Sequence, residues 1–174
     1  MLYTQTVAPE TLELLKRLES EPFMDSFSLA GGTALALYLG HRVSVDLDLF
    51  TPESFDEKQL EFSLRHKYGF QTKFTAQHTL KGTIGGVKID CIAHRYKSLR
   101  PPHMESGLRL YDMEDIIAMN SRRSPMTLPV KDFIHMGNSF RPFSLTPASV
   151  VSNANSPFRI VLGPVKGLLI FRID

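Results

Sequence analysis

The chain has 174 residues, of which 43% are hydrophobic and 22% charged, and this globular composition excludes a wholly disordered protein. The formal net charge of +2 is compatible with a nucleic-acid or nucleotide partner but does not indicate one. Cys91 is the single cysteine, so no internal disulfide is predicted. The longest apolar stretch, Phe27–Gly40, is shorter than the about 20 residues of a membrane span, and the N-terminus has no signal-peptide pattern. Together these features predict a cytoplasmic protein without a membrane partner.

The first fifty residues alternate between helical and strand patterns, with glycines at the breaks. In chain order we expect a helix over residues 10–19, a strand over Ser26–Ala30, a Gly31-Gly32 turn, a helix over Thr33–Leu39 that ends at Gly40, and a strand over His41–Phe50. In the last of these, the strict alternation predicts Val43, Val45, Leu47 and Leu49 on the core face, and Arg42, Ser44, Asp46 and Asp48 on the polar face.

The middle of the chain continues in the same mixed manner. We expect a charged helix over Phe55–Tyr68 that ends at Gly69, and a helix from an Asp112 N-cap through Met119. Between them we expect strands over Phe70–Phe74 and Thr79–His94, with tight turns permitted at Gly82 and Gly85-Gly86. Cys91 lies on the apolar face of its strand and is predicted to be a core side chain.

This order of elements predicts an α+β fold, with a mixed, twisted β-sheet flanked by helices. We assign residues 1–120 to the core. Residues 121–174 have no sustained periodicity, so we expect a poorly specified, diverged or truncated C-terminal segment that packs on the core. The apolar stretch Phe158–Ile173 is expected to be core or interface rather than a membrane anchor.

Three aspartates are the main candidates for chemistry. Residues two apart on a strand point the same way, so Asp46 and Asp48 present two carboxylates to one place, and Asp90 on another strand adds a third. Such mutually repelling groups favour a bound cation, and hard oxygen ligands with an open side favour Mg²⁺. The alternative is that Asp46 and Asp48 are solvated carboxylates on an exposed strand face and that Asp90 only takes part in a hairpin turn.

A strand-to-helix turn at Gly31-Gly32, with Thr33 after it, would offer free backbone N–H groups and a helix N-terminus to a phosphate. A phosphate cradle beside a metal site is the minimum equipment for phosphoryl or nucleotidyl transfer. The same glycines are also compatible with an ordinary turn that binds nothing.

The stretch Phe27–Phe50 resembles the first motif of the AbiEii/AbiGii family of nucleotidyltransferase toxins, which belong to the DNA polymerase beta-like nucleotidyltransferase superfamily. The residues that carry the resemblance are Gly31-Gly32-Thr33-Ala34-Leu35, His41-Arg42, Ser44, Asp46-Leu47-Asp48-Leu49-Phe50, Val87-Lys88-Ile89-Asp90, Pro101-Pro102, Gly107-Leu108-Arg109-Leu110 and Asp115–Met119. The resemblance implies a nucleotidyltransferase fold, Mg²⁺-dependent use of an NTP, an RNA acceptor such as tRNA, a toxin role in phage defence, and a cognate antitoxin.

The chain also departs from the family pattern in its second half. A lysine that the family places after Ala118-Met119 is Asn120 here, and the last acid of a Lys-Asp-Phe-x-Asp pattern is His135. Lys131 and Asp132 match the first part of that pattern, which implies an active-site lysine and acid; an ordinary helix-start charge pair is the alternative. Pro157–Phe171 distantly resembles a C-terminal helix of the family.

Several residues have two interpretations. Arg42 and Ser44 either contact phosphate or pair with the carboxylates, and the basic run His94–Arg100 is either a solvated loop or a contact to an RNA backbone. The six histidines have no paired ligand spacing, so no zinc site is predicted.

The leading hypothesis is therefore a Mg²⁺-dependent nucleotidyltransferase that moves a nucleotide from an NTP to an acceptor, with Asp46, Asp48 and Asp90 as metal ligands and catalytic groups. A catalytically impaired nucleotide- or RNA-binding protein of the same fold is the alternative, because of Asn120. An aspartyl phosphotransferase with Asp46 as nucleophile is a third reading, but it leaves the Gly-Gly turn without a role.

Overall fold

A computed structural model of the chain describes residues 1–95, 98–123, 150–151, 158–162 and 168–172. The chain divides into two compact units, residues 1–123 and 124–174. The predicted packing of the second segment on the first stays a prediction.

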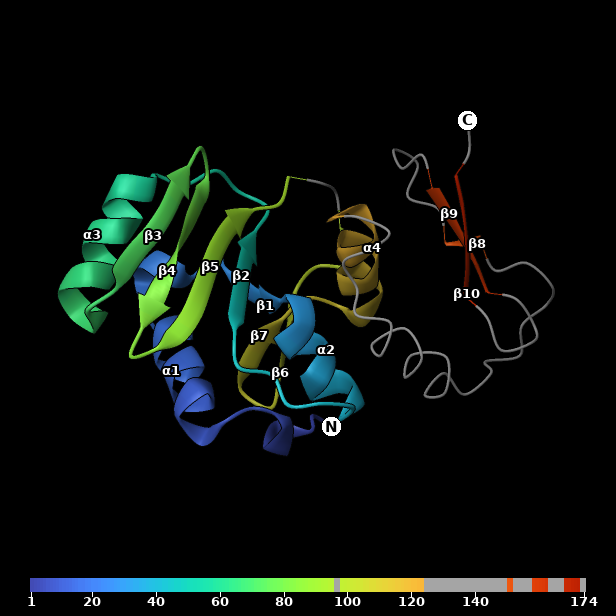
Figure 1. Cartoon of the computed structure of the whole chain (residues 1–174), viewed down its shortest axis with the longest axis horizontal. Coiled ribbons are helices and arrows are strands. Elements are labelled where there is room, and N and C mark those ends of the chain that lie inside the picture. Colours follow the sequence, from blue (N-terminus) through green and yellow to red (C-terminus); the bar gives the residue numbers. More distant parts are fainter. Residues whose placement is uncertain (96–97, 124–149, 152–157, 163–167, 173–174) are drawn as a thin grey trace. The chain divides into compact units, whose positions relative to one another are not determined.

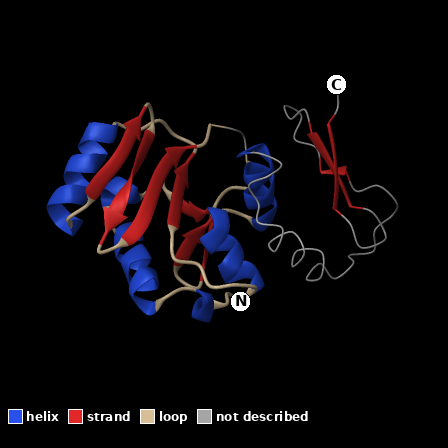
Figure 2. Cartoon of the chain, in the orientation of Figure 1, coloured by secondary structure: helices blue, strands red, loops and turns tan. Residues whose placement is uncertain are grey.

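The first unit contains helices and strands in mixed order (Figures 1 and 2). Its elements are η1 (Thr4–Thr6), α1 (Pro9–Glu19), η2 (Pro22–Met24), β1 (Ser28–Ala30), α2 (Gly31–Leu39), β2 (Leu47–Thr51), α3 (Glu57–Tyr68), β3 (Gln71–Ala76), β4 (Thr79–Ile84), β5 (Val87–Ala93), β6 (His103–Glu105), β7 (Leu108–Leu110) and α4 (Met113–Arg123). No helix among the described residues has the length and apolar character that crossing a bilayer requires.

The seven strands form one sheet in the order β3-β4-β5-β2-β1-β7-β6. The β2–β5 and β1–β7 pairs are parallel, and the other neighbours are antiparallel. The predicted α+β class with a mixed sheet is confirmed.

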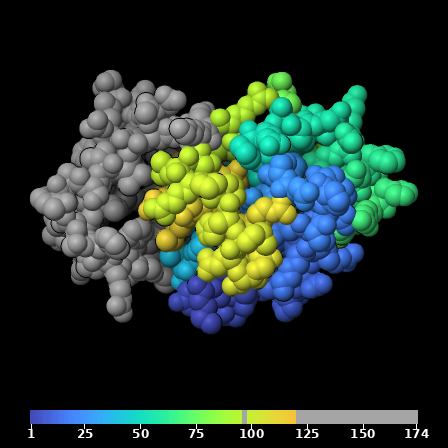
Figure 3. All heavy atoms as spheres, turned by 180° about the vertical axis from the view of Figure 1, so that it is seen from behind, coloured from blue at the N-terminus to red at the C-terminus, as the bar shows by residue number. Residues whose placement is uncertain are grey.

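One face of this sheet is apolar. Leu29, Leu49, Cys91 and Leu80 are cross-strand neighbours in register and are at most 1% exposed. The amphipathic helices α1 and α3 bury leucines in the core (Leu14, Leu15, Leu18, Leu60 and Leu64). Figure 3 views the molecule from behind, where α1 and α3 form much of the surface. Cys91 is a core side chain, as predicted.

Arg109 joins α1 to β7. Its guanidinium donates to the backbone oxygens of Glu19 and Met24 at 2.7 and 3.1 Å, and its backbone N–H donates to the Glu19 carboxylate at 2.9 Å. Burial nevertheless raises the pKa of Glu19 to about 7. Arg109, one of the residues that carry the family resemblance, therefore has a structural role, because it holds β7 against α1.

The prediction that a strand spans His41–Phe50 is wrong in its first half. β2 begins only at Leu47, and Val43 and Val45 are 67% and 58% exposed rather than buried. The reason is Ser44, which is buried and whose N–H donates to Thr6 O at 2.9 Å. Anchoring Ser44 inward turns its two valine neighbours outward.

The helix boundaries agree better with the sequence. Asp112 caps α4, accepting from Glu114 N–H at 3.0 Å, although the helix continues past Met119 to Arg123. α2 starts at Gly31 itself, so the two glycines form its first turn rather than a separate loop.

The second unit contains β8 (Val150–Val151), β9 (Phe158–Leu162) and β10 (Leu168–Arg172), which form an antiparallel sheet in the order β10-β9-β8. The expectation, implied by the family resemblance, that Pro157–Phe171 contains a helix is therefore wrong. A glycine and a proline at Gly163-Pro164 separate two apolar runs of hairpin length, which suits two paired strands.

Candidate active site

Two of the three predicted aspartates, Asp48 and Asp90, lie side by side on the polar face of the sheet, and Asp46 lies just before β2. Asp48 on β2 and Asp90 on the parallel strand β5 are direct register partners, so their backbones are about 4.8 Å apart and their side chains leave the same face. Asp46 precedes Asp48 by two residues. Asp90 is buried at 3% exposed, and half of the Asp46 side chain is exposed. These three residues are called the carboxylate cluster below.

Two lysines contact the cluster. Lys81 Nζ lies 2.7 Å from Asp90 Oδ2, and Lys88 Nζ lies 3.4 Å from the same oxygen and 4.0 Å from Asp46 Oδ2. The Lys88 distances also show that the Asp46 and Asp90 carboxylates approach one common point. Charge repulsion among the aspartates is thus offset by ammonium groups.

Gly31 is the residue on which the carboxylate of Asp48 packs. Its φ is +64°, and a Cβ built there would lie 2.7 Å from Asp48 Cγ. Any side chain at position 31 would therefore displace Asp48. The first turn of α2, with its free N–H groups, is consequently adjacent to the carboxylate cluster.

Thr33 and Ser44 act on the backbone that carries Asp46. Both are buried, their hydroxyl oxygens are 2.8 Å apart, and Thr33 also donates to the backbone oxygen of Asp46. This network fixes the entry to β2. Contact of either hydroxyl with phosphate stays a prediction.

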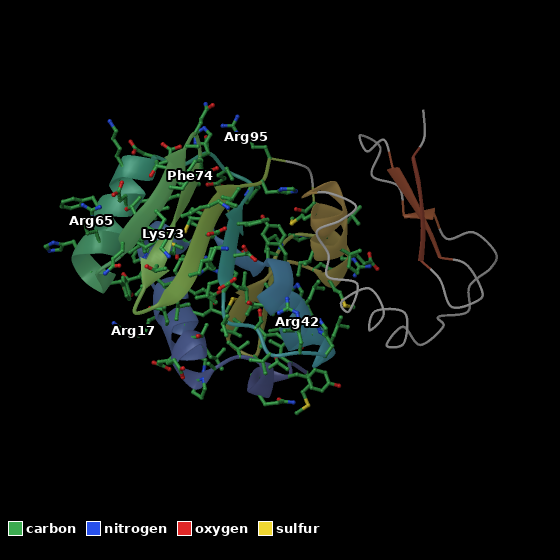
Figure 4. The ribbon with its side chains drawn as sticks, in the orientation of Figure 1. Arg17, Arg42, Arg65, Lys73, Phe74 and Arg95 are labelled. Atoms are coloured by element: carbon green, nitrogen blue, oxygen red, sulfur yellow. The ribbon has the colours of Figure 1, made fainter. Side chains whose placement is uncertain are left out.

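Arg42 lies over the start of α2. Its guanidinium is the group that a Cβ at Gly32 would meet, and it donates to Ser44 Oγ at 3.3 Å. Figure 4 shows Arg42 beside α2. A cation beside a helix N-terminus is well placed for an anion. Both interpretations of Arg42, contact with phosphate and pairing with a carboxylate, stay predictions.

Other predicted residues are less informative. Lys131, Asp132 and His135 lie outside the described residues. The backbone of Asn120 belongs to α4. Cys91 faces away from the cluster, and burial raises the pKa of its thiol far above the usual range, so it is not a nucleophile.

Sequence reasoning missed Lys81 and Lys88, yet both had a signal. Lys88 lies two residues before Asp90 on the same strand. Gly85-Gly86 forms a two-residue turn between β4 and β5, and counting outward from it pairs Lys81 with Asp90, as observed.

The residues suit a divalent cation in their chemistry. Carboxylate oxygens are ligands of Mg²⁺, and Asp90 Oδ1 is a buried atom without a hydrogen-bond partner among the described residues, which a cation would satisfy. Within that same part of the chain, however, no three His, Cys, Asp or Glu side chains are already arranged as ligands. Lys81 and Lys88 stand among the carboxylates instead.

Comparison with known proteins identifies the family. The model of the nucleotidyl transferase AbiEii toxin family, type IV toxin–antitoxin system, matches residues 13–119, a range that contains Gly31 and all three aspartates. This chain belongs to the AbiEii nucleotidyltransferase toxin family. The resemblance noted in the sequence is confirmed.

An uncharacterised protein of Aquifex aeolicus is 33% identical over 132 residues, which are 71% of this chain and 62% of that relative. The chain thus spans about three fifths of the relative's length. Two solved structures are similar at 19% identity. ANT(2″)-Ia in complex with adenylyl-2″-tobramycin has a TM-score of 0.45 and covers 76% of this chain and 85% of its own. A nucleotidyltransferase from H. pylori has a TM-score of 0.42 and covers 65% and 58%.

Proposed function

We propose that this chain is a Mg²⁺-dependent enzyme that transfers a nucleotide from an NTP to an RNA acceptor such as tRNA, as the cytoplasmic toxin of a toxin–antitoxin pair that serves phage defence. Membership of the AbiEii family supports nucleotidyl transfer and an antitoxin partner. The observation that carries the proposal is the register pairing of Asp48 with Asp90, with Asp46 and Asp90 both within 4.0 Å of Lys88 Nζ and Gly31 packed against Asp48.

Each group would have a defined task. The carboxylate cluster would hold the cation, which supplies charge neutralisation for the phosphates. The first turn of α2 at Gly31-Gly32, together with Arg42, would bind and orient the triphosphate. The acceptor hydroxyl would attack the α-phosphate, pyrophosphate would leave, and Asp90 would orient or deprotonate that hydroxyl.

The test is transfer of label from NTPs radiolabelled at the α-phosphate. We expect the purified full chain with Mg²⁺ to label RNA with at least one NTP, and EDTA to abolish the labelling, because the triphosphate is bound through the cation. NTP binding without transfer would instead support the impaired binding protein that Asn120 suggests. Absence of both NTP binding and transfer would contradict either function.

The polar face of the sheet suggests where the acceptor binds. Phe74 on β3 is the register partner of Lys81, which is in turn the partner of Asp90. The Phe74 side chain is 52% exposed, and Lys73 beside it is exposed as well (Figure 4). An exposed aromatic ring among lysines, about 10 Å from a catalytic carboxylate, is typical of a surface on which a base stacks.

Phe74→Ala is therefore expected to raise the KM for the RNA acceptor by about tenfold, since stacking of one base contributes about 1–3 kcal/mol. The KM for NTP should stay unchanged. Phe62→Ala is the matched control, because Phe62 is 70% exposed on α3. An equal effect of both variants, or an effect on NTP alone, would contradict this placement of the acceptor.

A further inference from the structure

Lys88 is held near the carboxylate cluster more loosely than Lys81. Its Nζ is 3.4 Å from Asp90 Oδ2 and 4.0 Å from Asp46 Oδ2, beyond the usual length of a strong N–H···O hydrogen bond. Half of its side chain is exposed, whereas Lys81 is 31% exposed and donates to Asp90 at 2.7 Å. Lys81 is a fixed partner of Asp90; Lys88 is attached mainly by charge.

The charge balance around this lysine changes when a cation binds. The ammonium groups of Lys81 and Lys88 offset part of the negative charge of the three carboxylates. A divalent cation placed among the carboxylates would add two positive charges there, and it would repel the nearest ammonium groups. Lys88 bridges Asp46 and Asp90, so it occupies the space between two of the expected ligands.

We propose, building on the nucleotidyltransferase function above, that Lys88 is an exchangeable counter-ion: it pairs with Asp46 and Asp90 in the cation-free protein and with the phosphates of the NTP once a cation is bound. The lysine stem is long and flexible, and its ammonium carries three donors that suit phosphate oxygens. The same ammonium thus opposes binding of the cation alone and favours binding of the cation with NTP.

Opposite signs of these two effects make the proposal testable. In Lys88→Met, the Kd for Mn²⁺ alone should fall about fivefold, because a competing positive charge is gone. The Kd for a non-hydrolysable NTP analogue in saturating Mn²⁺ should rise about fivefold, because a phosphate ligand is lost. Titration calorimetry of the full chain measures both constants without turnover.

Two further variants serve as controls. Lys88→Arg keeps the charge and should leave both constants close to wild type, and thermal unfolding checks that each variant folds. Lys58→Met removes an exposed lysine on α3 and should change neither constant. Unchanged or same-direction shifts in Lys88→Met, with wild type binding both ligands, would overturn the role of Lys88 alone. Wild type binding neither ligand would overturn the nucleotidyltransferase proposal as well.

Discussion

Asp48→Asn is expected to lower the rate of nucleotide transfer by at least about 1,000-fold at saturating NTP, since a neutral amide is a much weaker ligand of Mg²⁺ than a charged carboxylate. Asparagine is nearly isosteric, so the strand pairing of β2 with β1 and β5 should persist. Asp46→Asn should behave similarly. The label-transfer assay measures the rate, and circular dichroism with thermal unfolding checks the fold.

The matched control is Asp25→Asn. The Asp25 side chain is 74% exposed and lies 4.0 Å from Arg109, outside the cluster, so its transfer rate should equal that of wild type. If induced expression of the wild-type chain inhibits growth, Asp48→Asn should relieve the inhibition and Asp25→Asn should not. Near-normal transfer in both Asp46→Asn and Asp48→Asn would remove the proposed mechanism.

Gly31→Ala is expected to lower transfer by about 100-fold or more, because a displacement of about 1 Å at a reacting centre has effects of that size. The new methyl group would lie 2.7 Å from Asp48 Cγ. Because β2 is fixed by its packing in the sheet, the carboxylate of Asp48 has to move. The variant should also unfold at a lower temperature, since φ at this position is +64°.

Gly69→Ala separates these two effects. Gly69 has φ +68°, but a Cβ there would meet nothing within 4 Å. Both variants should therefore lose a similar stability of about 1 kcal/mol from backbone strain, while only Gly31→Ala should lose transfer. Equal activity losses in the two variants would mean that contact with Asp48 is unimportant.

The sequence predicted the parts of the fold that depend on local chemistry. Period-2 and period-3.6 patterns located the core strands and helices, Gly40 ended α2, and Asp112 capped α4. The failure at Val43 and Val45 has a tertiary cause. Alternation predicts which residues share a face, but the contacts of Ser44 with Thr6 and Thr33 decided which face is buried.

For the site, the sequence by itself indicated which groups are candidates for chemistry: three aspartates, two of them separated by a single residue, and a glycine pair at the start of a helix. Their meeting depended on the parallel pairing of β2 with β5, and on the contact between Gly31 and Asp48. Only the tertiary structure decided this pairing and this contact, because the core that strands bury together determines which of them pair when they are far apart in sequence. The place of Lys88 between Asp46 and Asp90 was likewise decided by the tertiary structure, since Asp46 lies just before β2 and Asp90 lies on β5.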